Sequence, residues 1–528
     1  MANLFSPGNL THAERGETAL DAVTITLHPN DNVAISRTAL LPRTVLTSDT
    51  DSITVARMVP PGHKIAIAPI AEGAEILRYG QIIGHASTDI QAGDHVHTHN
   101  VVTHQGELKL DYDFSSQVIP VDYAPEAERR TFKGFRRPDG RVGTRNYLGI
   151  IASVNCSSTA TQRIVEHFRD NPIMEQYPNV DGVIGFPTKG GCGAHHGSAH
   201  LAMLQRTMAG IVDHPNVGGY IVMSLGCEDN QPQEMIENTS MHHQQPTVVT
   251  IQEDGGFRKS VEAGIAAVEA LLPVVNSFER EEVPASELTV ALQCGGSDGW
   301  SGVTANPALG KAADLIVAQG GTVVLGETSE VYGGEHLLTR RAVTPEIGQK
   351  LVDKIHWWEE YTAMWGAEID NNPSPGNKLG GLTTIYEKSL GAIAKAGTTP
   401  MTDVIEYAER ITGCGFIHMD TPGFDPVSAT GQVAGGCNLV VFTTGRGSAF
   451  GFKPAPSLKI ATNSTLFAKQ EPDMDINAGK MLDGVSLEDM GAEIFDHILR
   501  VASGEQTKSE ADDIGEEEFN PWMLGATL

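Results

Sequence analysis

Residues 293–302 read Gln293-Cys294-Gly295-Gly296-Ser297-Asp298-Gly299-Trp300-Ser301-Gly302. An apolar run at 288–292 precedes this stretch and predicts a buried strand, and a helix is expected to follow, with Asn306 as N-cap and Pro307 at its first position. Open α/β sheets build their sites in such turns, at the carboxyl ends of strands. We therefore expect a site here, with Cys294 and Asp298 as candidate metal ligands.

The same pattern of strand, cysteine-bearing turn and helix occurs three times earlier in the chain. A near-continuous apolar run at 147–154 predicts a buried parallel strand, and the segments at 180–186 and 219–225 are expected to repeat this unit. The turns that follow them contain Cys156, Cys192 and Cys227. This alternation predicts parallel α/β layering both in the middle of the chain and towards its C-terminus.

We expect the four cysteine turns to converge on one metal-dependent site for a small anionic substrate. Thiolates are good ligands for transition metals, and two outcomes are open: a redox-sensitive iron with mixed ligands, or an iron–sulfur cluster held by three or four of the cysteines. The alternative is that the cysteines are small residues that fill tight turns. A hard cation would instead use the acidic residues at strand ends, which are Glu228, Asp298, Glu327 and Glu330.

The composition is that of a globular, turn-rich enzyme. The chain has 528 residues, of which 40% are hydrophobic and 57 are glycines. Its formal net charge of -29 repels nucleic acid, so no nucleic-acid partner is expected. The sequence has neither an apolar run of about 18 residues nor a signal-peptide pattern, and we expect a cytoplasmic protein without a membrane partner.

Short alternating segments between residues 21 and 112 predict a small all-β domain. Residues 95–100 read His95-Val96-His97-Thr98-His99-Asn100, and alternate side chains of a strand point to the same face. His95, His97 and His99 are therefore candidates to face one ligand. The alternative is a solvated polar face.

Several basic and amide side chains are candidates for binding or proton transfer. His195 and His196 follow a cysteine turn, where a histidine could remove a proton α to a carboxylate; the alternative is a surface position. Arg446 lies between two glycines and suits a carboxylate. Asn377 and Lys378, in a Pro/Gly-rich loop, are expected to form a second anion contact.

Three further predictions concern organisation. Residues 113–145 are expected to be a linker, with arginines that are either solvated or attract a carboxylate. Residues 371–378 are expected to be a loop. Ser486 and Asp489 predict a capping box for a helix at 487–503, and the acidic tail beyond it is expected to be peripheral.

Taken together, these residues resemble the altronate/galactarate dehydratases of bacterial sugar-acid catabolism. The motifs that carry the resemblance are Pro61-Gly62-His63-Lys64, Tyr79-Gly80, Gly226-Cys227-Glu228, Cys294-Gly295-Gly296-Ser297-Asp298, Ser301-Gly302, Thr304-Ala305-Asn306-Pro307, Asn372-Pro373-Ser374-Pro375-Gly376-Asn377-Lys378, Thr444-Gly445-Arg446-Gly447 and Lys459-Ile460-Ala461-Thr462. They span nearly the whole chain, and as a set they are highly specific.

The resemblance implies an α/β protein with three domains. After a loose N-terminus at 1–20, we expect a β-clip domain of the SAF type at 21–112, the linker, a middle α/β domain at 146–283 and a C-terminal domain at 284–528. The middle and C-terminal parts are expected to be Rossmann-like. A homodimer is expected.

The family implies loss of water from a sugar acid to give a 2-keto-3-deoxy acid, with iron(II) or another divalent metal as cofactor. Residues 95–100 resemble altronate dehydratases, whereas 284–288 and 338–343 resemble galactarate dehydratases. D-Altronate is the favoured substrate, and galactarate is the alternative. Sulfolactate sulfo-lyase is a more distant relative, and a ligand-binding protein without activity is a rival of another class.

The expected mechanism uses a bound iron that holds the substrate C1 carboxylate and C2 hydroxyl. A base among His97, His195 and His196 removes the C2 proton, and the metal and Arg446 stabilise the enediolate while the C3 hydroxyl leaves. The motif that contains His63 and Lys64 is expected to contact the substrate. The N-terminal domain is expected to act as a lid that excludes water.

Overall fold

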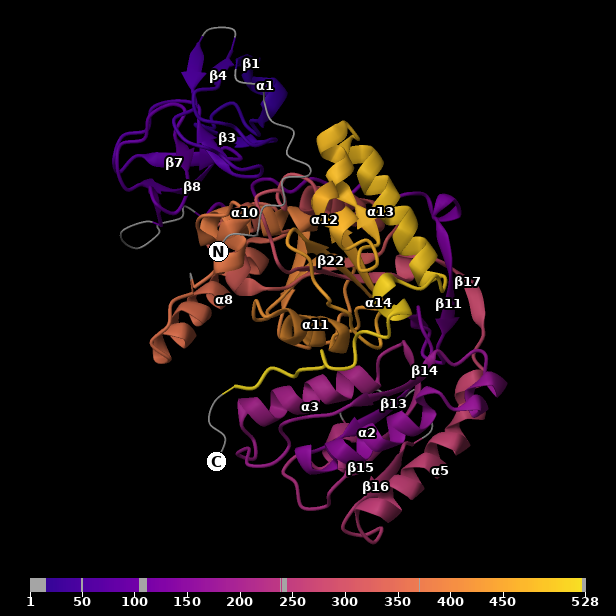
Figure 1. Cartoon of the computed structure of the whole chain (residues 1–528). Helices are drawn as coiled ribbons and strands as arrows, with labels where there is room; N and C mark the ends of the chain where they lie inside the picture. The colour runs from indigo at the N-terminus through magenta and orange to yellow at the C-terminus, as the bar shows by residue number, and fades with distance from the viewer. Residues whose placement is uncertain are drawn as a thin grey trace.

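The computed structural model describes residues 16–48, 51–103, 112–237, 239, 245–369 and 371–524. Figure 1 shows three parts: an N-terminal domain of strands, a middle α/β domain at the opposite end of the molecule, and a C-terminal α/β domain between them. Most of the segment predicted to be a loose N-terminus lies outside the described residues. Residues 17–23 form β1 (Glu17–Ala19) and α1 (Leu20–Val23).

The N-terminal domain contains three small sheets, ordered β2-β3-β6-β9, β10-β8-β7 and β1-β4-β5. The remaining strands are β2 (Thr24–Ile25), β3 (Val33–Ser36), β4 (Val45–Thr47), β5 (Ser52–Thr54), β6 (Lys64–Ala66), β7 (Glu75–Arg78), β8 (Gln81–Ala86), β9 (His95–Val96) and β10 (Val101–Val102). The predicted small all-β domain is thereby confirmed. Its antiparallel β6–β9 pair sets Ile65 opposite His95, so two distant histidine segments become neighbours.

Part of the segment predicted to be a linker forms a sheet. The strands β11 (Thr131–Arg136), β12 (Val142–Gly143) and β17 (Arg280–Pro284) pair in the order β12-β11-β17. Phe132 and Phe135 of β11 are buried, which gives this strand a core-facing side. Arg137 is also buried and donates a 2.7 Å hydrogen bond to the carbonyl oxygen of Pro215, so it has a structural role.

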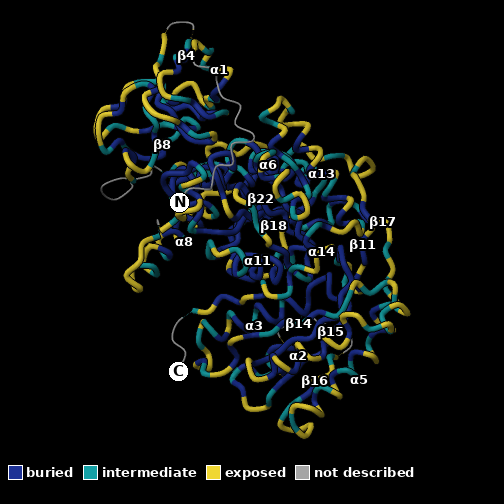
Figure 2. Tube along the Cα trace, in the orientation of Figure 1, coloured by how far each residue is buried: buried dark blue, intermediate teal, exposed yellow. Residues whose placement is uncertain are grey.

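The middle domain is a four-stranded parallel sheet ordered β14-β13-β15-β16. Its elements are β13 (Tyr147–Ala152), α2 (Asn155–Arg169), β14 (Gly182–Phe186), α3 (Ala199–Val212), β15 (Val217–Ser224), α4 (Pro232–Glu237), β16 (Thr247–Thr250) and α5 (Phe257–Asn276). Strands β13 and β15 are buried along their whole length, as their apolar runs predict. Figure 2 shows these strands as the dark centre of the domain.

The C-terminal domain is built on a seven-stranded parallel sheet ordered β20-β21-β19-β18-β22-β23-β24. The strands are β18 (Thr289–Cys294), β19 (Thr322–Leu325), β20 (Met401–Ile405), β21 (Gly415–Met419), β22 (Leu439–Thr444), β23 (Ser457–Ala461) and β24 (Ile476–Asn477). After β18 the chain forms β19 on one side of β18, and it later forms β22 on the other side of β18. This reversal of strand order creates a crevice at the carboxyl ends of β18 and β22.

Helices cover both faces of this sheet. They are α6 (Ala305–Ala318), α7 (His336–Thr339), α8 (Pro345–Met364), α9 (Pro375–Leu379), α10 (Ile385–Ile393), α11 (Asp425–Ala434), α12 (Ser464–Lys469), α13 (Leu487–Ala502) and α14 (Lys508–Ala511). Val290 and Leu292 pack in one core with α6 and α13, whereas Ala291 packs in another with α11 and with α3 of the middle domain. The parallel α/β class is thus confirmed, while the Rossmann-like classification stays a prediction.

Local structure differs from expectation at two places. The helix α6 begins at Ala305 with Thr304 at the N-cap, two residues before the predicted N-cap Asn306. The predicted loop at 371–378 contains the first residues of α9, where Ser374 and Asn377 form a capping box. The predicted C-terminal helix is confirmed as α13, because the Ser486 side chain accepts a hydrogen bond from the backbone of Asp489.

The tail after α13 is structural and not peripheral. Glu510 forms an ion pair with the buried Arg145 at 2.6 Å, which connects the tail to the start of the middle domain. Phe519 and Trp522 are buried, and the Trp522 ring stacks on that of Trp358 with centroids 5.1 Å apart. The aromatic residues at the end of an otherwise acidic segment provide this anchorage. None of the helices in the described ranges is long and apolar enough to span a membrane.

The N-terminal domain docks on the C-terminal domain through a buried ion triad. Lys64 and Arg78 both bind the carboxylate of Glu387 on α10, and the Lys64 Nζ lies 2.7 Å from its Oε1. All three side chains are at most 1% exposed. Burial alone would raise the pKa of Glu387, but the two cations lower it to about 2, so the carboxylate is charged.

We predict that Glu387→Gln lowers the free energy of unfolding by about 3–5 kcal/mol, because it leaves two buried cations without their counter-ion. A matched control is Glu493→Gln, which removes a surface pair with Lys480 whose side chains are 42% and 48% exposed. The control should change the unfolding free energy by about 0.5 kcal/mol or less. Urea unfolding of the full chain measures both, and equal small effects would contradict the prediction.

The same triad predicts a pH dependence. The folded pKa of Glu387 is about 2 against an ordinary value of 4.5, so its contribution to stability is fully present above pH 4.5. That contribution should fall as the pH decreases from 4.5 towards 2. The difference in unfolding free energy between the wild-type protein and Glu387→Gln should shrink over the same window, and a constant difference would contradict the assignment.

Candidate metal and substrate site

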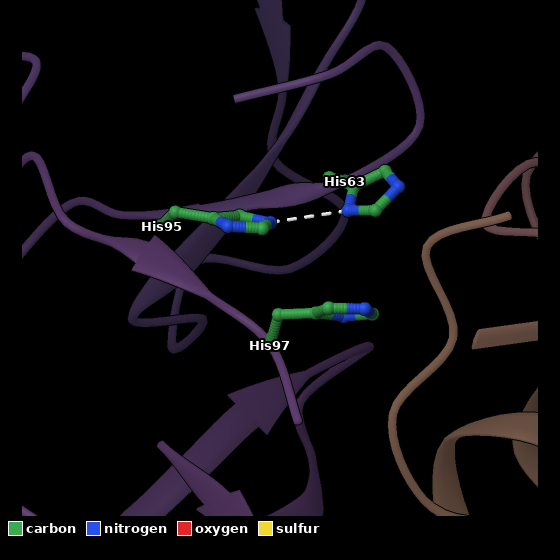
Figure 3. A group of neighbouring side chains, drawn as sticks. All are labelled: His63, His95 and His97. Atoms are coloured by element: carbon green, nitrogen blue, oxygen red, sulfur yellow. Dashed lines mark hydrogen bonds between the residues drawn. The ribbon is translucent and has the colours of Figure 1, made fainter. Parts of the chain in front are cut away.

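Three histidines of the N-terminal domain form a compact group, shown in Figure 3. His63 precedes β6, His95 begins β9 and His97 follows it. The His63 Nδ1 lies 3.1 Å from the His95 Nε2, and the His97 ring centroid is 4.9 Å from that of His63. One ring nitrogen from each residue lies within 4.8 Å of the other two, which is close enough for all three to bind one metal ion.

The chemistry of this group fits a divalent transition metal. Burial lowers the pKa of His63 to about 4, of His95 to about 3 and of His97 to about 4, and the neighbouring cations act in the same direction. The rings are therefore neutral at pH 7, which is the form that donates a lone pair. The Nδ1 of His97 is also buried without a hydrogen-bond partner. From the sequence, His97 was predicted to be a base that removes a proton. In the structure it lies among potential metal ligands.

The histidine group faces a loop of the C-terminal domain. The His63 Nε2 lies 3.2 Å from the carbonyl oxygen of Leu379, and the Lys64 Nζ donates a 2.7 Å hydrogen bond to that of Gly381. Gly299 approaches so closely that a Cβ atom there would lie 2.1 Å from the carbonyl oxygen of Gly62. The site is therefore formed jointly by two domains.

Arg446 and Asp298 lie against the same loop. An added Cβ on Gly380 would lie 2.9 Å from the Asp298 Cβ and 3.3 Å from the Arg446 Cδ, so both side chains contact this glycine closely. Arg446 is exposed, and it follows β22 in the crevice beside β18. The structure thus brings Arg446, Asp298 and His63 around residues 379–381, as the prediction of one shared site requires.

Asp298 already has a complete set of hydrogen bonds. It accepts 3.1 Å bonds from the hydroxyls of Ser301 and Thr462 and a 3.0 Å bond from the backbone of Trp300. The Asn463 Nδ2 donates a further bond at 3.2 Å. These bonds fix the turn between β18 and α6. Asp298 was predicted to be a metal ligand. In the structure its carboxylate instead stabilises this turn.

Two predicted substrate contacts have other partners in the structure. Lys64 is fully buried in its ion pair, so its ammonium is closed off from a substrate. Asn377 is buried, caps α9 through Ser374 and donates a 2.8 Å hydrogen bond to the carbonyl oxygen of Ser297. The neighbouring Lys378 is half-buried on the same helix and remains available as an anion contact.

A second group of potential ligands lies beneath this surface. Cys294, Glu327 and Glu330 are buried, with ligand atoms within 4.8 Å of one another. The Lys395 Nζ already lies 2.8 Å from the Cys294 Sγ and 2.7 Å from the Glu327 Oε2, and burial raises the pKa of the thiol to about 12. A buried ammonium therefore compensates this group, and Lys388 compensates Glu330 at 2.6 Å.

No pattern in the sequence indicated the cations of this buried network. Lys388 and Lys395 lie in and just after α10, in a segment that contains no recognisable binding pattern. Glu387, which anchors the N-terminal domain, lies in the same segment. Only the apolar character around these residues, in which three charged groups are unusual, could have indicated buried ion pairs.

The predicted convergence of four cysteines is wrong. Cys156, Cys192 and Cys227 are exposed in the middle domain, whereas Cys294 is buried in the C-terminal domain. The reason is that the strands preceding them belong to two different sheets, whose carboxyl ends do not form one edge. His195 and His196 are exposed beside Cys192, apart from the histidine group of the N-terminal domain.

Glu228 also has a different role from the predicted metal ligand. It is buried and accepts hydrogen bonds from the hydroxyls of Ser153 and Ser224 at 2.5 and 2.6 Å, and from the backbone of Gly226 at 2.6 Å. Although burial opposes its charge, these bonds lower its pKa. The carboxylate thus connects two turns of the middle domain.

Three family models match the chain along most of its length. Residues 22–104 match the altronate/galactarate dehydratase SAF domain, and residues 134–276 match the second domain of D-galactarate dehydratase/altronate hydrolase. Residues 285–527 match the C-terminal part of D-galactarate/altronate dehydratase. The chain thus has the domain composition of a sugar-acid dehydratase.

Characterised relatives agree with this class. The chain is 36% identical to an altronate dehydratase of Bacillus subtilis (strain 168) over 96% of this chain and 99% of that protein. It is 37% identical to the altronate dehydratase of Escherichia coli (strain K12), over 93% and 97% of the two chains. It is 38% identical to the galactarate dehydratase (L-threo-forming) of the same organism, over 93% and 94%. This chain belongs to the altronate/galactarate dehydratase family, whose members are hydro-lyases.

We predict that His63→Ala, His95→Ala and His97→Ala each weaken binding of a divalent metal by at least roughly tenfold, because each removes one of three nitrogen ligands. His99→Ala is a matched control, since His99 is an exposed neighbour outside the group. Anaerobic equilibrium dialysis with iron(II) measures all four variants. Binding that is unchanged in the three variants, or equally weakened in the control, would contradict this assignment.

Proposed function

We propose that the chain removes water from D-altronate to give a 2-keto-3-deoxy acid, and that His63, His95 and His97 hold a divalent iron for this reaction. The observation that carries the proposal is the group of three neutral imidazoles facing the loop that contacts Arg446. When bound, a divalent iron supplies Lewis-acid stabilisation of charge on substrate oxygens. Dehydration next to a carboxylate needs such stabilisation more than any other contribution.

The chain's own residues would bind and orient the acid. Arg446 is exposed, and its planar guanidinium suits a carboxylate in a bidentate arrangement. Lys378 adds a second positive charge on the neighbouring helix. Both cations attract a small anion to one place on a strongly acidic protein, which favours a sugar acid over a neutral sugar.

The docked N-terminal domain would limit access of water to the reacting atoms. The glycines at 62 and 299 bring the two backbones into contact, and the ion triad holds them there. Exclusion of water strengthens each electrostatic contact inside a site. The identity of the base among His97, His195 and His196 stays a prediction, and the proposed role of His97 as a metal ligand argues against it as the base.

The choice between substrates depends on the N-terminal domain. The three relatives have nearly equal identities, which favour neither altronate nor galactarate. The stretch at 95–100 resembles altronate dehydratases and contributes two of the three proposed ligands, so we favour altronate. Galactarate is the alternative, since 284–288 and 338–343 resemble galactarate dehydratases.

The proposal is tested by loading the purified chain with iron(II) anaerobically and assaying keto-acid formation from altronate, galactarate, glucarate and galactonate. Altronate should give the largest kcat/KM. Galactarate as the best substrate would overturn the choice of substrate and keep the class. Activity that is independent of added or bound metal would overturn the proposed role of the histidines, and sulfite release from sulfolactate would favour a sulfo-lyase.

We predict that Arg446→Ala lowers kcat/KM by about 10- to 100-fold, because a charge-assisted contact to a carboxylate contributes about 1.5–3 kcal/mol. Arg446→Lys should retain part of the activity, since it keeps the charge and loses the planar fork. Arg163→Ala, which removes an exposed arginine on α2, is the control and should leave kcat/KM unchanged. Full activity in Arg446→Ala would exclude this arginine from the substrate site.

A further inference from the structure

The three exposed cysteines of the middle domain lie on adjacent turns. In the sheet order β14-β13-β15-β16, the first three strands are immediate neighbours and parallel, and each is followed by a segment that contains one cysteine, in the case of Cys156 the first turn of α2. Cys192 follows β14, Cys156 follows β13 and Cys227 follows β15. All three are free thiols exposed to solvent, in turns at the same edge of one sheet.

Hydrogen bonds connect the three turns to one another. The backbone of Asn155 donates to the carbonyl oxygen of Gly190 at 3.0 Å, which joins the Cys156 and Cys192 turns. The backbone of Asn230 donates to the carbonyl oxygen of Gly191 at 3.0 Å, which joins the Cys192 and Cys227 turns. The Ser153 hydroxyl donates a 2.5 Å hydrogen bond to the Glu228 carboxylate, which joins the Cys156 and Cys227 segments. The three thiols are thus supported by one rigid frame.

Close backbone packing sets the positions of the thiols further. An added Cβ on Gly191 would lie 2.3 Å from the carbonyl oxygen of Ser153, so this turn lies directly on the β13 turn. Asp229 accepts a 2.7 Å hydrogen bond from the backbone of Gly193. Such fixed turns are typical of sites whose ligands come from several loops.

The three sulfur atoms are not all close enough together for a single ion. A single zinc or iron ion at about 2.3 Å from each sulfur requires sulfur atoms roughly 4 Å apart. These three cysteines, all within the described residues, do not form a group whose ligand atoms lie within 4.8 Å of one another. An iron–sulfur cluster spans a wider gap, because its cysteines bind different iron atoms.

We propose that Cys156, Cys192 and Cys227 bind a four-iron, four-sulfide cluster at this edge of the middle domain. Each thiol loses its proton and its sulfur donates a lone pair to one iron, which leaves the fourth iron open to a ligand from solution. The cluster site is on a different sheet from the histidine group and is independent of the metal proposed there. A negative result for the cluster would therefore leave the proposed function unchanged, and a negative result for the proposed function would leave the cluster proposal unchanged.

The surroundings suit the negative charge that such a cluster carries. Cys156 is the second residue of the 15-residue helix α2, and the N-cap of this helix has no side-chain hydrogen bond. The backbone N–H groups of Asn155 and Ser157 already donate to the carbonyl oxygens of Gly190 and Val154, so the favourable contribution at this end is the helix dipole, which favours negative charge. The Gln252 Nε2 lies 3.3 Å from the Cys227 Sγ and provides a further donor.

The test is anaerobic reconstitution of the full chain with sulfide and equal amounts of ferric and ferrous iron, a mixture that needs no external oxidant. After desalting, the wild-type chain should retain about four acid-labile sulfide per chain, with about four iron in addition to any iron held by the histidine group, and absorb broadly in the visible range. Cys156→Ser, Cys192→Ser and Cys227→Ser should each lose most of the labile sulfide. Circular dichroism of each variant shows whether it is folded.

Two controls separate this site from the others. Cys414→Ser changes another exposed thiol, and His97→Ala changes the proposed histidine site; both variants should retain the labile sulfide of the wild-type chain. The proposal is overturned if the reconstituted wild-type chain retains no labile sulfide, or if the three folded cysteine variants keep their labile sulfide. It is also overturned if Cys414→Ser loses as much as they do.

Discussion

The buried contact of Lys64 and Arg78 with Glu387 is the constraint on which the site depends. Taking three charged groups out of water costs several kcal/mol each, and the cost is offset only when the charges meet in good geometry. The N-terminal domain therefore has one favourable position on α10. That position sets His63 against Leu379 and brings a histidine group from one domain to a crevice of another.

The strand order of the C-terminal sheet forms the other part of the candidate site. The chain departs from β18 in both directions across the sheet, so the turns after β18 and β22 border one crevice. Asp298 and its hydrogen-bond partners hold the first turn, and the second presents Arg446. Glycines at 299 and 380 let these turns approach the N-terminal domain at backbone distance. A rigid crevice and a docked β domain thus lie together around the proposed site.

Local patterns in the sequence predicted much of the fold, because they are read over a few residues. Apolar runs identified the buried parallel strands, and alternation identified the β domain. Which strands share a sheet depends on long-range packing, and for this reason the expected meeting of Cys294 with Cys227 was wrong. The partnership of His63 with His95 arises from the β6–β9 pair, and the burial of Lys64 depends on a contact 323 residues away. Neither has a local signature.

The central claim is that one metal ion lies between two domains, held by three imidazoles. The most direct measurement is crystallography of the iron-loaded chain with anomalous scattering recorded on both sides of the iron absorption edge. The account predicts an anomalous peak within bonding distance of ring nitrogens of His63, His95 and His97, beside residues 379–381. An iron peak at Cys294, Glu327 and Glu330, with none among the histidines, would contradict it.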